Sequence, residues 1–112
     1  MANLVPLNTF KTTTAVVTTQ KQVVYVAPIG VSTVVLLAQF VSISDTTQNV
    51  SFYHTRSGVD TEIAVGFPIP PNDAGNLLSG RLILEQGDSV KVQASSNNSF
   101  KFVFSYLETA NA

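Results

Sequence analysis

The chain contains no cysteine and no tryptophan, and it carries little charge. The absence of cysteine excludes disulfide scaffolds, thiol catalysis and cysteine-based zinc sites. Charged residues make up 12% of the chain, about half the roughly 25% that is usual for soluble globular domains. A net charge of −1, with six cations scattered along the sequence, provides no clustered basic surface for nucleic acid. We therefore expect no cofactor and no nucleic-acid partner.

Long hydrophobic runs are also missing. The longest purely apolar run, Val34 to Ala38, is far shorter than the roughly 20 residues that span a bilayer. The N-terminus, Met1 to Pro6, has neither the basic start nor the apolar core of a signal peptide. We therefore expect a chain that is made in a cytoplasm, is not exported by a standard signal and has no membrane partner.

Neutral polar residues and β-branched residues take the place of the missing charge. The 112 residues include 16 Val, 12 Thr, 11 Ser and 8 Asn, and hydrophobic residues still account for 45%. The length predicts one domain, and a domain of this size buries only about two-thirds of its chain surface. The apolar side chains therefore exceed what one small core can hide, which favours a homo-oligomer. The alternative is a neutral monomer coated with Ser and Thr.

Alternating apolar and polar residues, separated by turn-forming residues, predict about eight strands and no long helix. Short strands at this spacing predict an all-β fold, a single antiparallel β-sandwich of the jelly-roll or immunoglobulin-like type. The predicted domain covers residues 10–108, with an extended N-terminal arm at 1–9 and a C-terminal tail at 109–112. The predicted strands are 12–19, 23–27, 31–43, 50–55, 60–67, 81–85, 89–95 and 100–107.

The run 31–43 is apolar on both faces in its middle, which predicts a central strand covered on both sides. A helix is the competing interpretation, but the β-branched residues favour a strand. The proline-rich segment 68–76 is expected to cross from one sheet to the other, with Asn72 or Asp73 capping a short helical turn that runs to Leu78.

Strand alternation also separates a predicted core from a predicted interface. The predicted core consists of Val35, Leu37, Phe52, Ile63, Val65, Leu82, Leu84, Val90, Val92, Phe100, Phe102, Phe104 and Tyr106. The predicted subunit interface consists of Val34, Leu36, Phe40, Val103 and Leu107.

Residues able to carry chemistry are few. The single histidine, His54, precedes a predicted hairpin tip, and Asp60 and Glu62 follow on the returning strand. These three side chains form a weak candidate for a cation site, and the alternative is a hairpin surface on which a neutral histidine lies beside two carboxylates. The sequence has neither a Gly-x-Ser-x-Gly motif nor a glycine-rich phosphate loop. We expect no catalytic residues and no metal.

Three segments carry a resemblance to known proteins: a Thr-rich opening that leads into Val23 to Gly30, the Phe67 to Ala74 crossover, and the stretch from Leu77 to Val92 before the close at Phe104 to Glu108. The layout resembles small all-β accessory virion proteins of tailed bacteriophages, including those of cyanobacteria and marine bacteria. The similarity covers Thr12 to Glu108. It implies a structural protein that binds other virion proteins and has no catalytic residues.

Our hypothesis is a phage virion structural protein, located in the virion and assembled in the host cytoplasm. Its expected partners are major capsid or tail proteins and further copies of itself. It would serve as capsid decoration or cement, or as a neck, tail or baseplate component. The alternative is a carbohydrate- or receptor-binding module of a phage tail, although Trp is absent and Tyr25, Tyr53 and Tyr106 are scattered. A small enzyme has only His54 in its favour.

Overall fold

The computed structural model describes residues 8–78 and 80–110, and in this part of the chain all regular structure is β-strand. No helix among these residues is long and apolar enough to cross a membrane. The strands are β1 (Asn8–Val17), β2 (Gln22–Val26), β3 (Val31–Ser42), β4 (Gln48–Arg56), β5 (Val59–Ile69), β6 (Ala74–Asn76), β7 (Leu82–Leu84), β8 (Ser89–Ala94) and β9 (Phe100–Ala110).

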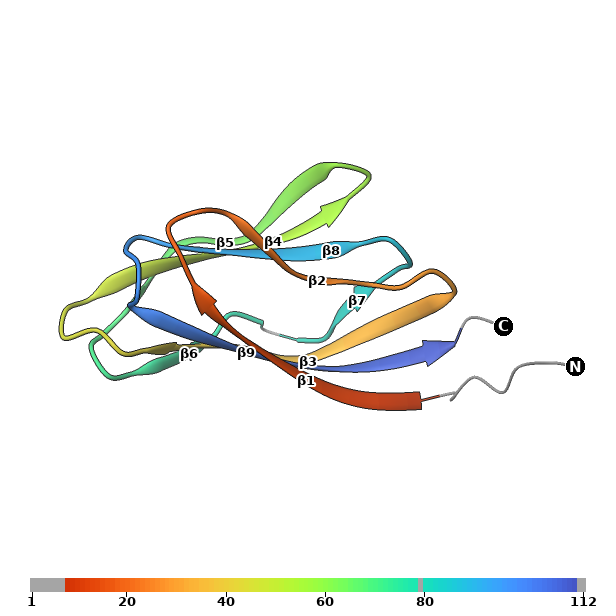
Figure 1. Ribbon diagram of the computed structural model, residues 1–112, viewed down its shortest axis with the longest axis horizontal. Helices are drawn as coiled ribbons and strands as arrows, with labels where there is room; N and C mark the ends of the chain where they lie inside the picture. The colour runs from red at the N-terminus through yellow and green to blue at the C-terminus, as the bar shows by residue number, and fades with distance from the viewer. Residues whose placement is uncertain (1–7, 79, 111–112) are drawn as a thin grey trace, which may run out of the picture.

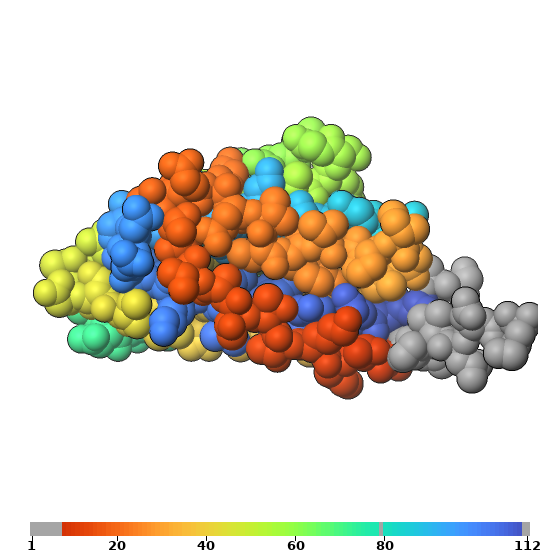
Figure 2. Space-filling model, in the orientation of Figure 1, coloured from red at the N-terminus to blue at the C-terminus, as the bar shows by residue number. Residues whose placement is uncertain are grey.

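The strands form two layers, which Figure 1 shows one above the other. The five-stranded sheet has the order β1-β9-β3-β6, with β7 also paired to β3, and the four-stranded sheet has the order β2-β8-β4-β5. Every pairing is antiparallel. The prediction of an antiparallel β-sandwich is confirmed, and the alternation of strands between the sheets is that of a jelly roll. In the space-filling view the edge strands β1 (red) and β2 (orange) cover the face turned to the viewer (Figure 2).

The sandwich extends further at both ends than the sequence predicted. Asn8 pairs with Thr109, and Thr9 pairs with Glu108. Ala110 pairs with Val31 on β3. Residues 8–9 of the predicted arm and residues 109–110 of the predicted tail are therefore strand, because each has a pairing partner in the sheet. The remainder of the arm and of the tail lies outside the described residues.

A β-bulge in β3 changes which of its residues face the core. The register with β9 shifts between Val35 and Leu37, so that Leu36 has no partner across the strands. One extra residue reverses the alternation, since successive side chains of a strand point to opposite faces. Val35 and Phe40 are consequently both buried, whereas Leu37 is only half-buried. The predictions of Leu37 as a core residue and of Phe40 as an interface residue are therefore wrong.

The proline-rich segment crosses between the sheets, as predicted, but forms no helical turn. β5 continues through Pro68 to Ile69 in the four-stranded sheet, and β6 then pairs with β3 in the five-stranded sheet. Pro68 is tolerated because β5 is an edge strand, where a missing N–H group costs no hydrogen bond on the open side. The predicted cap at Asn72 or Asp73 is followed by β6, a short strand that the sequence analysis missed.

Aromatic rings fill the space between the layers. Phe102 lies 4.7 Å from Phe40, 5.8 Å from Phe52 and 5.7 Å from Phe104, measured between ring centroids. Burying these rings removes a large apolar area from water, which is the main favourable contribution to folding. The predicted core residues that are buried are Val35, Phe52, Leu84, Val90, Val92, Phe100, Phe102, Phe104 and Tyr106, and Ile63 and Leu82 are partly buried against them.

Val65, by contrast, was wrongly placed in the core, since 66% of its surface is exposed. The register of β4 and β5 shifts between the pairs Val50–Phe67 and Phe52–Ala64, so that Val65 and Gly66 have no register partner on β4, although the Gly66 N–H donates to Ser51 Oγ at 3.0 Å. Gly66 adopts φ of +61°, a left-handed conformation that glycine accommodates without steric cost. The bulge turns Val65 away from the core.

Candidate functional site

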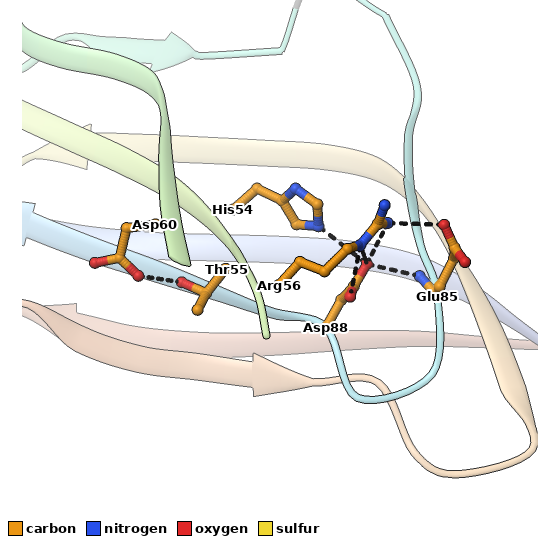
Figure 3. Close-up of polar contacts among 6 residues, drawn as sticks. All are labelled: His54, Thr55, Arg56, Asp60, Glu85 and Asp88. Carbon is orange, nitrogen blue, oxygen red and sulfur yellow. Dashed lines mark hydrogen bonds and ion pairs between the residues drawn. The ribbon is translucent and has the colours of Figure 1, made fainter. Parts of the chain in front are cut away.

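The three residues predicted as a cation site do not converge. His54 pairs across the strands with Thr61, whereas Asp60 pairs with Thr55 and Glu62 pairs with Tyr53. His54 and Thr55 are neighbours on β4 and therefore point to opposite faces of the sheet. Both carboxylates accordingly lie on the face away from His54. Figure 3 shows His54 directed towards Asp88, while Asp60 lies apart beside Thr55.

Asp88 is the centre of the polar cluster that contains His54. It follows Gly87, which adopts φ of +84° in the tight turn before β8, and its side chain is only 4% exposed. Arg56 at the end of β4 donates from Nε to Oδ1 at 3.0 Å and from Nη2 to Oδ2 at 2.6 Å. His54 Nε2 lies 3.0 Å from Oδ2, and the backbone N–H of Glu85 donates to the same oxygen at 3.0 Å. We call these four residues the Asp88 cluster.

The Asp88 cluster joins the four-stranded sheet to the turn between β7 and β8. Hydrogen bonds from Arg56 hold the pKa of Asp88 well below its usual range, with further contributions from His54 and the backbone of Glu85, and together these outweigh the effect of burial. Arg56 also forms an ion pair of 2.9 Å with Glu85. The Asp88 carboxylate is therefore a fixed anion whose acceptor positions are occupied, which suits a structural role better than proton transfer.

Asp60 forms a second polar cluster on the opposite face of the same sheet. Its carboxylate accepts hydrogen bonds from Thr55 at 2.6 Å, from Lys21 at 3.0 Å and from Lys91 at 3.0 Å. These bonds, led by that from Thr55, lower the pKa of Asp60. The Lys21 ammonium also lies 4.2 Å from the centre of the Tyr53 ring, in cation–π contact. Two cations already occupy the carboxylate that a metal ion would need.

A third polar cluster contains residues of β1, β2, β3 and β9. Tyr25 Oη is 2.8 Å from Thr33 Oγ1 and donates to Glu108 Oε2 at 2.5 Å. Burial, together with the hydrogen bond to Glu108, raises the pKa of Tyr25. Burial alone would raise the pKa of Glu108, but hydrogen bonds from Lys11 and Tyr25 outweigh it and lower that pKa. Lys11 and Glu108 form an ion pair of 2.8 Å, so this cluster is also satisfied internally.

Within residues 8–78 and 80–110, no three His, Asp or Glu side chains gather in a way that could hold a metal ion. Every buried side-chain nitrogen or oxygen in the same part of the chain has a hydrogen-bond partner. The three tyrosines are buried or half-buried, Tyr53 and Tyr106 in the first class and Tyr25 in the second, so they form no exposed platform of the kind on which sugars stack. The charged groups of the three clusters are thus bound to other groups of the same chain.

The outer face of the five-stranded sheet, in contrast to the polar clusters, is apolar and nearly uncharged. Alternation and register place on it one side chain in two from β1 and β9, and the residues of β3 and β7 that point away from the core. Across β1, β9 and β3 the outward positions contain one charged residue, Lys101. We call this surface the outer face, and its apolar residues are Phe10, Val16, Val34, Leu36, Leu37, Val41, Ile83, Val103 and Leu107.

One row of apolar residues crosses the outer face from edge to edge. Phe10 on β1 pairs with Leu107 on β9, Leu107 pairs with Val34 on β3, and Val34 pairs with Ile83 on β7. Phe10 is 73% exposed and Ile83 is 51% exposed, so the row ends in two prominent side chains. Four strands thus contribute one apolar residue each, and we call them the apolar row.

Most of the predicted interface lies on the outer face. Val34, Leu36, Val103 and Leu107 point outward, and only Phe40 is in the core, as described above. Leu36 lies in the bulge of β3 and, together with Phe10, Thr12 and Ser105, lines a shallow hollow of about 270 Å³. The sequence analysis missed Phe10 and Ile83, because only the register of β1 and β7 against their neighbours shows that they belong to the same row.

Comparisons with known proteins identify a similar fold but no family. No family model matches this sequence, and no curated protein matches it. Among solved structures, a chain from Bacillus endospore appendages, described as a novel family of disulfide-linked pili, is similar with a TM-score of 0.56 and 9% identity, covering 99% of this chain and 100% of that one. Eiger TNF from S. frugiperda has a TM-score of 0.41 and 17% identity, covering 80% of this chain and 66% of that one. The first likeness shows a shared fold.

Proposed function

We propose that this protein is a non-enzymatic structural subunit, an accessory virion protein of a tailed bacteriophage, that assembles through the outer face. In the virion it serves as capsid decoration or cement, or as a component of the neck, tail or baseplate. The observation that carries the proposal is the character of the outer face, where β1, β9 and β3 present a single charged residue, Lys101. Exposed apolar patches of this extent are typical of protein–protein contact surfaces.

The internal pairing of the three polar clusters supports the non-enzymatic part of the proposal. Asp88, Asp60 and Glu108 each bind cations or hydroxyl groups of the same chain, so none is free to act on a substrate. A general acid or base needs an accessible proton-binding site with a pKa near the working pH. The pKa values of these three carboxylates are all shifted away from neutrality.

Disulfide bonds cannot link copies of this chain. The similar chain from endospore appendages belongs to disulfide-linked pili, which is one example of this fold in a structural assembly. The present chain has no cysteine, so it has no such linkage available. We propose that subunit contacts come instead from burying apolar area, which contributes about 25 cal/mol for each Å² removed from water.

Particle composition tests the proposal. Virions are purified by density gradient from cells that produce the tagged protein. Mass spectrometry gives the protein composition of the particles, and labelling of the tag locates the protein in a low-resolution map of the particle. We expect the protein to remain with the particles in a fixed ratio to the major capsid or tail protein. Recovery of the protein only in the unassembled fraction would overturn the virion assignment.

A further inference from the structure

We infer that a second copy of this chain covers the outer face, with the two five-stranded sheets packed face to face and the apolar row of one copy lying against that of the other. The inference rests on the proposed function, in that it names the partner of the same surface. In this arrangement the dimer, and not the single chain, is the unit that binds to the particle.

The size of the outer face fits an interface between two copies. Eleven residues of β9 at a rise of about 3.3 Å, and four strands spaced by about 4.8 Å, give a face of roughly 700 Å². Stable specific interfaces bury about 800 Å² of accessible surface per partner. Accessible surface includes the relief of the side chains, which the flat estimate of the face leaves out. A small ligand or a single peptide would cover only part of this area.

Charge also favours a copy of the same face. The outward positions of β1, β9 and β3 contain Lys101 as their single charged residue. A partner with a charged surface would therefore lose the hydration of its charges without gaining compensating contacts. A second outer face contains one cation and is otherwise neutral. Lys101 lies one residue from the start of β9 and therefore at the rim, where water screens the two ammonium groups from each other.

The register determines how the two faces are oriented. The apolar row passes through Leu107, towards one end of β9. A two-fold axis running across the strands at Ser105, the middle of β9, would bring the two faces into full overlap but place this row against the row through Val103, which contains Thr14, Gln39 and Asn76. A two-fold axis parallel to the strands, between β9 and β3, places the row on itself. That arrangement matches apolar side chains with apolar side chains.

With the axis parallel to the strands, the two ends of the apolar row exchange partners. Phe10 of each copy lies over Ile83 of the other, and Leu107 lies over Val34. The hollow beside Phe10, lined by Thr12, Leu36 and Ser105, gives space in which side chains of the second copy can interdigitate. Sheets that pack face to face in this way are normally about 10 Å apart with interleaved side chains.

Analytical ultracentrifugation of the full chain from about 1 to 100 μM tests the dimer, a range that brackets micromolar dissociation constants. We expect a species of twice 12.0 kDa for the wild type. Phe10→Glu and Ile83→Glu each place a carboxylate at one end of the apolar row, and each is expected to weaken dimerisation at least tenfold. Val65→Glu is the matched control, because Val65 is an equally exposed aliphatic residue on the other sheet, and it should leave the dimer unchanged. A cooperative thermal transition in each variant would show that it is folded, since loss of the dimer by itself lowers the melting temperature.

Cross-linking tests the orientation, and the absence of native cysteine makes it specific. In one chain, residues 10 and 83 are three strand spacings apart, roughly 14 Å, so a short bis-maleimide cannot join them within a copy. The double variant Phe10→Cys with Ile83→Cys should give covalent dimers, whereas Phe10→Cys alone should give few. Efficient cross-linking of the single variant, with none gained in the double variant, would overturn the parallel axis.

The outcomes separate this inference from the virion proposal. A wild type that stays monomeric at 100 μM, or a dimer that survives both glutamate variants, overturns the inference. Face variants that are monomeric like the wild type but no longer join particles would assign the outer face to another virion protein, which also overturns it. A dimer with the expected properties, made by a protein that is absent from particles, would support the inference and overturn only the virion role.

Discussion

Arg56 and Asp88 lie 32 residues apart in sequence and form a bidentate ion pair, with Nε 3.0 Å from Oδ1 and Nη2 2.6 Å from Oδ2. The pair fastens the last residue of β4 to the turn that precedes β8. Because Asp88 is buried and Arg56 is half-exposed, the pair closes one end of the sandwich while leaving part of the guanidinium in water.

Replacing the acidic partner should destabilise the fold. Asp88→Ala leaves the donors of Arg56, His54 and the Glu85 backbone without their acceptor, and a buried donor left unpaired costs about 1–3 kcal/mol. Urea unfolding should therefore show a lower free energy of unfolding with an unchanged m-value. Glu85→Gln is the control, because the Glu85 side chain is 68% exposed and its pair with Arg56 is a surface contact. An Asp88→Ala protein as stable as Glu85→Gln would contradict a structural role for the cluster.

Acid should weaken the protein, and the sign follows from the two aspartates. The pKa values of Asp88 and Asp60 are lower in the folded state than in the unfolded chain, where an aspartate titrates near 3.9. The unfolded state consequently binds more protons at low pH, and the free energy of unfolding falls as the pH decreases through about 4 and below. Urea midpoints measured between pH 6 and pH 3 should decline, and Asp88→Asn should flatten that decline. An equally steep decline in Asp88→Asn would show that other groups cause it.

The two faces of β9 should respond differently to substitution. Phe102 is fully buried among Phe40, Phe52 and Phe104, so Phe102→Ala should cost about 3–5 kcal/mol, the range for truncated core aromatics. The neighbouring Lys101 is exposed, and Lys101→Ser should change stability by less than about 0.5 kcal/mol. Thermal melts of both variants compare the faces directly. Unfolding of Lys101→Ser with a stable Phe102→Ala would mean that the faces of β9 are reversed.

Two valines provide a matched test of the bulge in β5. Val90 is completely buried, whereas Val65 points to solvent beside Gly66. Val90→Ala should lose much of the roughly 1.5–3 kcal/mol that burying a valine contributes, while Val65→Ala should stay within about 0.5 kcal/mol of the wild type. Denaturation midpoints of the two variants are the measurement. Comparable losses in both would indicate that β5 pairs with β4 without the bulge.

Much of the fold is local information that the sequence carries by itself. The alternation of Phe100, Phe102, Phe104 and Tyr106 predicts that one face of β9 is buried, and the structure buries all four. Composition alone predicts an all-β protein rich in turns, since Val, Thr, Ser and Asn dominate it. Strand periodicity is set by neighbouring residues, so it can be detected without knowing what the strand packs against.

The residues that the sequence analysis misplaced lie at or after a register shift. A bulge adds one residue and reverses the faces of everything beyond it, which moved Phe40 into the core and Leu37 out of it. The bulge in β5 did the same to Val65. No local pattern marks the bulge in β3, because it is selected by how the strand fits its neighbours, whereas Gly66 is a local signal for the bulge in β5.

Side-chain partners were decided by tertiary structure as well. The sequence placed His54 with Asp60, its neighbour across the predicted hairpin, but the opposite orientation of adjacent strand residues sends His54 to Asp88, 34 residues away. The apolar row likewise brings Phe10, Val34, Ile83 and Leu107 together through three separate pairings. The sequence by itself determined which residues could be strand and which were apolar, because both are properties of single residues and their neighbours. Only the packing of strands distant in sequence could decide which of those residues meet.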